Sequence, residues 1–507
     1  MKILKYIGIG VIIISTSCSD DYFDVNSSET APTTTSLEPE YRIQGAIENT
    51  TGTAQYRGSR EVLGIVQYGA QNVENYYSET WSKELTTGNY FLWQNAYVYA
   101  LPNTADLIVL GREYNAPNYS AVGKILRAYI LGMTTDQYGD IVTDQTYDGE
   151  SSMNLTPEFV TQKEVYQTIF QLLDEAVAEL DQPSEIKLNE EGGDVLYQGD
   201  IERWKKFAYA IKARYMNHLS KKNSGDLAYD ANEIIALCEM AIATNQENAL
   251  VRFVGGEAEN SNQPFSEDGY GSSRIDYFSE FFVELLKNPL NINEAYQDPR
   301  LPIIVPEAVN GGFQGIMVGA GDTLKLKTVG GKQVYDDNYS KGNGGFYTSP
   351  DSPTYMFTYS EVKFIEAEAK FRSGDKAGAF ADLKMGVQAD MEKLEVPAAA
   401  MNEYLDILDT EIGVNNISLS HIMVQKYIAN MLNPETWVDM RRMDYSSDIY
   451  PGLQRPENVN LDIFPNDNDW IEAMMYEYNE EDRNYENMPD NSPVIRLTTP
   501  LWWNTPE

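Results

Sequence analysis

Apolar and polar residues recur with helical spacing over much of the chain, most clearly between residues 161 and 183. Thr161 and Glu164 form a capping-box pattern, in which each side chain satisfies a backbone N–H at the start of a helix. Apolar positions then recur every three or four residues: Val165, Ile169, Leu172, Leu173, Ala176, Val177 and Leu180. The pattern predicts an amphipathic helix that stops before Pro183.

A helical hairpin is predicted further along the chain. Thr358 and Glu361 repeat the capping-box pattern before VKFIEAEAKFR, and Gly374 interrupts the pattern before a second stretch, 376–394. Two helices joined by a glycine turn look like one repeat of a helical array. Further helices are expected at 40–50, 60–76, 91–112, 119–136, 201–221, 230–245, 275–287, 402–410 and 418–433. The predicted class is mainly α, a helical-hairpin core with inserted loops and a few short β-hairpins.

The segment 300–350 differs from the helical stretches on either side of it. Its glycines interrupt short β-prone pieces such as GIMV and KLKTV, which indicates loops and hairpins inserted into the helical scaffold. The glycines do not form a phosphate-binding loop, because the G-x-x-x-x-G-K-[ST] pattern after a strand is missing.

The first residues have the pattern of an exported protein. Lys2 and Lys5 precede a short apolar run at 7–14, which is too short to span a bilayer and is typical of a signal peptide. Cys18 follows small residues at the distance found in a bacterial lipobox, which it resembles, so residues 1–17 are predicted to be removed and Cys18 to be lipidated. The alternative is a free thiol beside a cleavage site. The acidic pair after Cys18 resembles a signal for the cell surface.

Residues 18–39 are predicted to be the lipidated N-terminus and a flexible tether, since they are rich in Ser, Thr and Pro. The ligand-binding domain is expected to cover 40–507, with the loop-rich insertion around 300–350. Outer-membrane localisation through a lipid anchor, facing the cell exterior, is therefore expected.

Charge and rare residues exclude several classes of function. The formal net charge of −39 disfavours nucleic acid and anionic lipid surfaces, because phosphates would be repelled. The only cysteine besides Cys18 is Cys238, in an apolar helical stretch that favours a buried structural role. His218 and His421 lie apart in sequence, and no His or Cys cluster has the spacing of zinc ligands.

Five stretches, in order, resemble the SusD/RagB family of outer-membrane nutrient-binding lipoproteins. They are ILRAYILGMTTDQYGDIVTDQ (125–145), ERWKKFAYAIKARYMNHLSK (202–221), FTYSEVKFIEAEAKFRSGD (357–375), VQKYIANMLNPETWVDMRRM (424–443) and VIRLTTPLWW (494–503). The resemblance implies a core of tetratricopeptide-like hairpins whose inserted loops form one ligand face. It also implies a lid on a SusC-like TonB-dependent transporter, which captures oligosaccharide, or less often peptide, and passes it on without catalysis.

The motif residues themselves favour a structural role. Charged and aromatic side chains recur there at helical spacing, where buried charges must be paired. We therefore expect the following residues to hold helices together: Arg127, Trp204, Glu366, Glu368, Trp437, Asp439, Arg441 and Arg442. Asp136 and Asp140 flank a Tyr-Gly pair at a helix end, where a turn is favoured over a metal site.

Aromatic residues in polar loops are the candidates for ligand contact, because flat rings stack on the apolar faces of pyranose sugars. The resemblance implies that the ligand surface comes from the loop before the third long helix and from the mid-chain insertions. The candidates there are the aromatic residues Tyr76, Tyr77, Trp81, Tyr90, Tyr270, Tyr339, Phe346 and Tyr347, together with Arg274. No cofactor is expected. A calcium ion near Asp467 and Asp469 is an alternative to a solvated acidic loop. A glycoside hydrolase and a scaffold without a small ligand remain as alternative functions.

Overall fold

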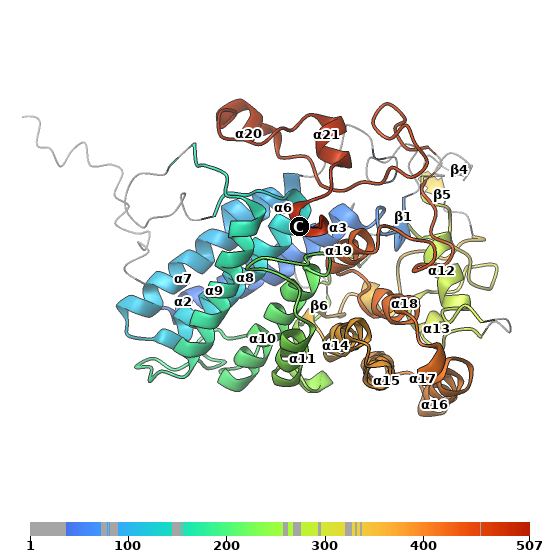
Figure 1. Cartoon of the computed structure of the whole chain (residues 1–507), viewed down its shortest axis with the longest axis horizontal. Coiled ribbons are helices and arrows are strands. Elements are labelled where there is room, and N and C mark those ends of the chain that lie inside the picture. The colour runs from blue at the N-terminus through green and yellow to red at the C-terminus, as the bar shows by residue number, and fades with distance from the viewer. Residues whose placement is uncertain are drawn as a thin grey trace, which may run out of the picture.

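The computed structural model describes most of the chain. The described residues are 37–71, 79, 81, 90–143, 154, 156–256, 262–266, 275–292, 296–319, 327–329, 332–334, 337–456 and 458–506. Cys18, the predicted signal peptide and almost all of the predicted tether lie outside these ranges. Helices dominate the described part, as the sequence pattern predicts (Figure 1).

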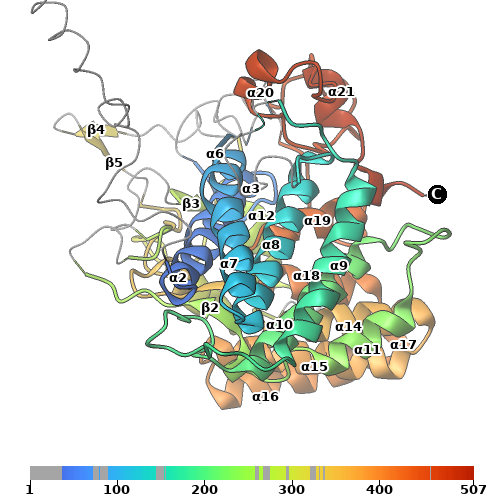
Figure 2. The same cartoon turned by 90° about the vertical axis from the view of Figure 1, so that its left-hand side faces the viewer.

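Four helices of the first half pack side by side in chain order: α7 (Leu101–Glu113), α8 (Pro117–Tyr138), α9 (Gln162–Leu180) and α10 (Ile201–His218) (Figures 1 and 2). Helix α8 lies at the centre, and every residue from Asn118 to Tyr138 is buried. Gly132 permits its close approach to α10, because an added Cβ would overlap the ring of Tyr215. Helix α9 begins with the predicted capping box at Thr161 and ends at Leu180, before Pro183.

The predicted hairpin is confirmed in the second half of the chain. Helix α14 (Tyr359–Ser373) begins where the Thr358 side chain accepts a hydrogen bond from the Glu361 N–H. Gly374 then adopts a φ of +91°, which ends the helix before α15 (Lys376–Lys393). Helices α11 (Ala231–Met240) and α18 (Leu419–Ala429) pack against this hairpin, so the array continues from α10 through α15.

The N-terminal elements differ in part from the expected ones. Helix α2 (Glu40–Glu48) leads into η3 (Asn49–Gln55) and α3 (Tyr56–Val62), and α6 (Tyr90–Gln94) leads into η4 (Asn95–Ala100) and then α7. The expected helix at 60–76 is wrong, since α3 ends at Val62. The apolar pattern continues beyond it because residues 63–68 are buried, but Gln67 has a φ of +58°, which no helix allows.

The strands are short and antiparallel. They are β1 (Gly69–Ala70) with β3 (Tyr277–Phe278), β2 (Ala249–Val251) with β6 (Thr354–Phe357), and β4 (Lys327–Val329) with β5 (Lys332–Val334). The last pair confirms a hairpin at KLKTV in the glycine-rich insertion. Strand β3 occupies the start of the helix expected at 275–287, so α12 begins only after Ser279 caps it.

Shorter elements complete the chain. They are α12 (Glu280–Lys287), α13 (Leu301–Ile304), α16 (Ala398–Ile407), α17 (Gly413–Asn416), α19 (Glu435–Arg442), α20 (Tyr478–Arg483), α21 (Pro493–Thr498), η5 (Asn245–Glu247), η8 (Phe346–Thr348), η9 (Leu408–Ile412) and η10 (Trp502–Asn504). Helices α20 and α21 lie along the upper edge in Figure 1. No helix in the described ranges is both long enough and apolar enough to cross a membrane.

Buried ion pairs connect the helices, as the motif residues predict. Arg442 on α19 donates to the Glu368 carboxylate on α14 at 2.8 and 2.9 Å, and to Asp439 at 2.6 Å. Asp439 also pairs with Lys426 on α18 at 2.8 Å. Arg127 on α8 donates instead to the backbone oxygens of Leu101 and Thr143. The ion pairs therefore hold α14, α18 and α19 in register, and removing one partner would leave a buried charge unpaired.

Candidate functional site

The chain segments beside the three predicted ligand loops meet at one place. Strand β1 leads into the first loop and pairs with β3, which follows the second loop. Ile316, before the third loop, bridges Ser279, and Lys341, after it, bridges Tyr277. Loops far apart in sequence therefore start from a shared base, at upper right in Figure 1 near β1.

A small apolar cluster forms this base, which we call the loop junction: Ala70, Tyr277, Ile316, Val318 and Tyr339. The rings of Tyr277 and Tyr339 meet edge to face, with centroids 6.2 Å apart. Tyr277 is fully buried, whereas Tyr339 is only partly buried and packs on the outside of the cluster. The junction therefore holds Tyr339 at the edge of the loop face.

Glu79 ties two of the loops together. Its carboxylate accepts hydrogen bonds from the backbone N–H groups of Gln71 and Gly319, the latter at 2.9 Å. The Asn458 side chain donates to the Gly319 carbonyl at 2.6 Å. Burial raises the pKa of Glu79 to about 8, although the two backbone hydrogen bonds act in the opposite direction. The Glu79 side chain is therefore mostly neutral at pH 7.

Glycines of the insertion allow the segments to approach closely. A Cβ added to Gly342 would overlap the backbone carbonyl of Ile275, and one added to Gly315 would overlap that of Ser279. Both contacts are to strand-like backbone that cannot move aside without breaking the junction. Close packing, and not a left-handed backbone conformation, therefore requires glycine at these two positions.

A groove of about 570 Å³ lies beside the loop junction. It is lined by Gln67, Glu280, Phe281, Glu284, Leu285, Asn288, Asn291, Met317, Val318, Pro451, Gly452, Gln454, Arg455 and Pro456. We call it the junction groove. Amide and carboxylate groups alternate there with apolar surface, and its volume is within the range of small-ligand sites. Such a lining can donate to and accept from several hydroxyl groups at once.

The predicted ligand residues differ in whether the structure describes them and in how far they are buried. Tyr76, Tyr77, Tyr270 and Arg274 lie outside the described residues, and so does the side chain of Tyr90, whose backbone begins α6. Tyr339 and Phe346 are partly buried, while Trp81 and Tyr347 are 0% and 4% exposed.

The two buried rings pack inside the protein. Trp81 contacts Phe464 and Trp470, with centroids 5.3 and 5.4 Å away. The Tyr347 hydroxyl donates to the Ala429 carbonyl on α18, and the Lys393 ammonium lies over its ring. In this arrangement neither ring offers a free face to a ligand.

The polar residues of the junction groove are not among the residues predicted from the sequence. Gln67, Asn291 and Gln454 come from three distant segments, and none belongs to a motif. Gln67 and Asn291 adopt left-handed backbone conformations, with φ values of +58° and +50°. These conformations are visible in the structure but not in the sequence. Their proximity depends on the pairing of β1 with β3, which sequence periodicity does not reveal.

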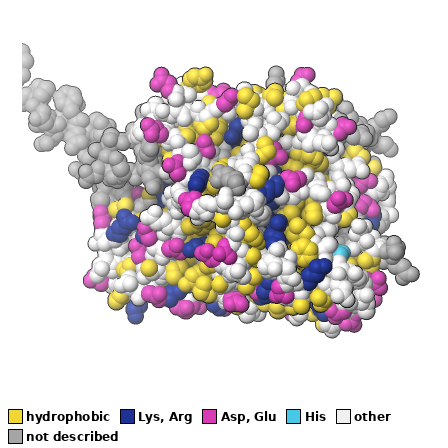
Figure 3. All heavy atoms as spheres, in the orientation of Figure 1, with side chains coloured by type: hydrophobic (Ala, Val, Ile, Leu, Met, Phe, Trp, Pro, Cys, Tyr) yellow, Lys and Arg dark blue, Asp and Glu magenta, His cyan; other side chains and the backbone are white. Residues whose placement is uncertain are grey.

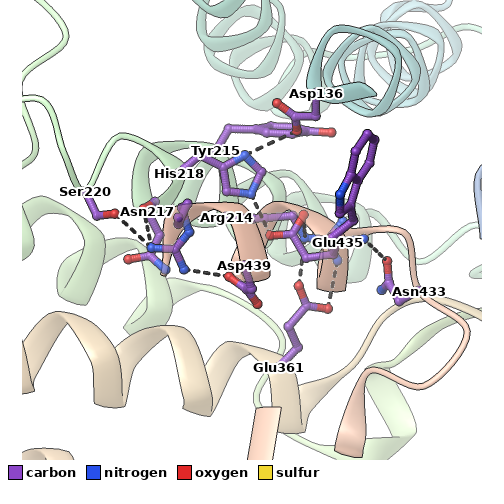
Figure 4. A network of polar contacts seen from close by, with 12 residues as sticks. Asp136, Arg214, Tyr215, Asn217, His218, Ser220, Glu361, Asn433, Glu435 and Asp439 are labelled. Atoms are coloured by element: carbon purple, nitrogen blue, oxygen red, sulfur yellow. Dashed lines mark hydrogen bonds and ion pairs between the residues drawn. The ribbon is translucent and has the colours of Figure 1, made fainter. Parts of the chain in front are cut away.

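Among the described residues, Asp136, His218 and Glu435 are close enough to share a metal ion, with candidate ligand atoms within 4.8 Å of one another. The fold therefore builds a cluster that sequence spacing did not indicate. The His218 ring lies between the two carboxylates, 3.2 Å from Asp136 through Nδ1 and 2.6 Å from Glu435 through Nε2 (Figure 4).

The geometry of this cluster is that of an ion-paired histidine. Burial alone would lower the pKa of His218, but the charges of Glu435 and Asp136 outweigh it and raise that pKa to about 9. Both ring nitrogens then carry protons, so neither offers a lone pair to a metal. Arg214 supports the same network through two 2.7 Å hydrogen bonds to Glu361.

The acidic loop considered for calcium already surrounds a cation. The Arg455 guanidinium donates to the backbone carbonyls of Phe464, Asn466 and Asp469, and lies 3.4 Å from the Asp467 carboxylate. These oxygens thus already face a positive charge, and a calcium ion near Asp467 and Asp469 stays an untested expectation. The Asp469 carboxylate accepts from Asn466 instead.

The helices of the described residues form an array of packed helical pairs, which is a repeat-like scaffold. A family model described as "Starch-binding associating with outer membrane" (SusD-like) matches residues 29–463. The chain therefore belongs to this SusD-like family, as the five sequence stretches predicted. A comparison with curated proteins found no match.

Solved structures share the same fold. A SusD homolog from Parabacteroides distasonis superposes with a TM-score of 0.74 at 19% identity, covering 93% of this chain and 99% of that one. A chitin-binding protein gives 0.72 at 22% identity, with coverage of 92% and 100%. A chitin-binding SusD homolog from Flavobacterium johnsoniae gives 0.69 at 18% identity, with coverage of 92% and 98%.

Proposed function

We propose that this protein binds an oligosaccharide at the outer-membrane surface and delivers it to a SusC-like TonB-dependent transporter without altering it. The observation that carries the proposal is the meeting of three loop regions beside the junction groove. The family match, and the names of two similar structures that bind chitin, support a glycan as the ligand class.

The lining of the junction groove suits sugar hydroxyl groups. The Asn291 and Gln454 side chains offer amide donors and acceptors at an exposed edge, and Glu280 adds an acceptor. Met317, which is 43% exposed, supplies apolar surface for the C–H face of a ring. A peptide is the second candidate, because the same amides could bond a backbone.

The groove carboxylates favour binding over hydrolysis. A glycosidase acid must hold its proton near neutral pH, which requires burial or a close like charge. Glu280 and Glu284 are both exposed, and Glu284 pairs with Lys287 at 2.7 Å. We therefore expect bound oligosaccharides to be recovered at their original length, which mass spectrometry after prolonged incubation measures. Shortened products would replace this proposal with a hydrolase.

Isothermal titration against a panel of oligosaccharides tests binding. The Gln454→Ala variant should weaken the affinity for the bound glycan roughly tenfold, the effect of losing a well-placed hydrogen bond or two. Gln388→Ala on α15 is the matched control, because Gln388 is also exposed and its side chain bonds Glu392 of its own helix. Equal affinities of the two variants would show that the junction groove is not the binding site. If the protein binds no glycan, a peptide-binding protein or a scaffold would be favoured.

Anchoring and delivery need separate tests. Cys18→Ala should leave the protein without acyl chains, so that it leaves the membrane fraction. Wild-type protein purified in detergent should retain a β-barrel transporter partner. Normal membrane retention of Cys18→Ala would contradict the anchor, and purification without any transporter would contradict delivery.

A further inference from the structure

Another groove, of about 530 Å³, lies on a different part of the molecule from the junction groove. It is lined by Trp93, Gln94, Tyr97, Val98, Glu477, Tyr478, Asn479 and Glu480. We call it the α20 groove, since α20 forms one wall and the α6–η4 stretch forms the other. Helix α20 lies at the upper edge in Figure 1, and apolar and acidic side chains both occur along that edge of the surface in Figure 3.

The inner wall of the α20 groove is aromatic and fixed. The Trp93 ring packs on Tyr97 and Tyr138, with centroids 4.6 and 5.1 Å apart, and stacks on Phe159 at 6.0 Å. The Tyr97 hydroxyl donates to the Val142 carbonyl at 2.7 Å, which holds this ring in place. The outer wall is Tyr478, which is 54% exposed. Trp93 is itself 4% exposed and supports the wall from behind, so a flat ligand would lie against the half-buried Tyr97 and the exposed Tyr478.

The polar groups of the α20 groove are acidic or neutral. The Glu480 carboxylate accepts from Trp93 Nε1 at 3.4 Å and from Asn484 at 3.3 Å, and both bonds are long. The Glu477 carboxylate accepts from the backbone and side chain of Asn479. The lining contains no lysine, arginine or histidine. Two carboxylates beside aromatic rings can attract an organic cation.

The acidic residues around the α20 groove add to its attraction for a cation. Burial raises the pKa of Glu477, hydrogen bonds from Asn479 oppose the increase, and the Glu480 charge adds to it. Residues 477–490 carry six acids and one arginine, Arg483, which is exposed and does not line the groove. A cation placed between Glu477 and Glu480 would relieve their repulsion.

We infer that the α20 groove binds an amino-sugar unit whose amine is protonated, such as a glucosamine residue within an oligosaccharide. The apolar face of the pyranose would lie on Tyr478 and Tyr97, the ammonium would face Glu480 and Glu477, and Gln94 would bond a hydroxyl. This inference rests on the proposed function, since it assigns a second subsite for the same class of ligand.

A sugar suits this groove better than a lysine side chain. A lysine needs only a narrow aromatic cage around its ammonium, whereas the volume here can take a whole ring with its substituents. Gln94 and Asn479 also add amides at the rim, which hydroxyl groups can use and an alkyl chain cannot. Hexalysine is therefore the comparison ligand.

Titrations with glucosamine hexamer and N-acetylglucosamine hexamer test the inference, because the two share a backbone and differ in charge. The glucosamine hexamer should bind roughly tenfold more tightly at low salt, the effect of a charge-assisted contact. The difference should shrink as salt screens the carboxylates. Equal affinities for the two hexamers, or binding of hexalysine in place of both, would overturn it.

Matched variants locate the effect. Glu480→Gln keeps an oxygen that can accept from Trp93 and should abolish the preference for the amine, whereas Glu486→Gln removes one charge from the same segment outside the groove and should not. Tyr478→Ala should weaken binding of the glucosamine hexamer severalfold. Tyr485→Ala, a more exposed ring of the same segment, should leave it unchanged. Equal effects within either pair would contradict a contact in the groove.

The two proposals fail in distinguishable ways. A protein that binds neutral glycans in a Gln454-dependent manner, but shows no amine preference, keeps the proposed function and loses this subsite. A protein that binds none of these glycans loses both.

Discussion

The backbone N–H of Gly319 donates a 2.9 Å hydrogen bond to the Glu79 carboxylate, although the two residues lie 240 positions apart in the chain. This bond joins the first predicted ligand loop to the glycine-rich insertion. The junction groove lies directly beside it, lined by Met317 and Val318. The shape of the proposed binding face therefore depends on a buried acid that is mostly protonated at pH 7.

Glu79 should make stability depend on pH. Because its pKa in the folded protein is raised to about 8 from 4.5, its stabilising contribution is complete below pH 4.5 and is lost as pH rises to about 8. Glu79→Gln stays neutral throughout. Denaturant unfolding between pH 5 and 8 should therefore show wild type losing up to about 1.4 kcal/mol per pH unit relative to the variant. Parallel pH profiles would contradict a protonated Glu79.

Gly342→Ala should damage the loop junction. The added methyl group would meet the Ile275 carbonyl, so the segment after the insertion must move away from β3. We expect weaker glycan binding and a destabilisation of ~1–3 kcal/mol, typical of overpacking. Gly52→Ala, whose Cβ meets no atom within 4 Å, is the control. Unchanged affinity and melting temperature of Gly342→Ala would show that the junction is not rigid.

His218→Gln tests the buried imidazolium. It leaves Asp136 and Glu435 without their shared cation, so unfolding free energy at pH 6 should fall by ~3–5 kcal/mol. The folded pKa of His218 is raised to about 9 from 6.5, so its contribution is complete below pH 6.5 and is lost as pH rises through 9. The difference between variant and wild type should therefore shrink at pH 10. A constant difference would mean that His218 is neutral in the folded protein.

Glu61→Met should stabilise the protein. Neither oxygen of the fully buried Glu61 carboxyl has a hydrogen-bond partner among the described residues. Burial raises its pKa to about 8, against the opposing charges of Arg60 and Arg57. Removing the group should raise the melting temperature, more at pH 8 than at pH 5, because the penalty grows between pH 4.5 and 8. A lower melting temperature at both pH values would contradict an unpartnered acid.

Local sequence signals predicted the helices that depend on local contacts. Thr161 and Glu164 mark the start of α9, and Gly374 marks the break between α14 and α15, because capping and left-handed turns involve neighbouring residues. The sequence does not predict the end of α3 at Val62, because the buried residues that follow continue an apolar pattern. The backbone conformation there depends on the pairing of Gly69 with Phe278, which is a long-range contact.

The family resemblance implies that the inserted loops form one ligand face, and the loop junction brings the bases of these loops together. Contact of the loops with a ligand stays a prediction. The sequence could not show that Trp81 turns inward onto Phe464, because a loop aromatic looks the same in sequence whether it is packed or exposed. The sequence also could not show that Gln67 contacts Gln454, because this contact depends on long-range packing.

The most direct test of the account is a crystal structure of the protein with the oligosaccharide that it binds most tightly. The account predicts sugar rings in the junction groove, against Met317 and within hydrogen-bond distance of Gln454 and Glu280. A ligand bound away from that groove and from the α20 groove, or a hydrolysed ligand in either, would contradict it.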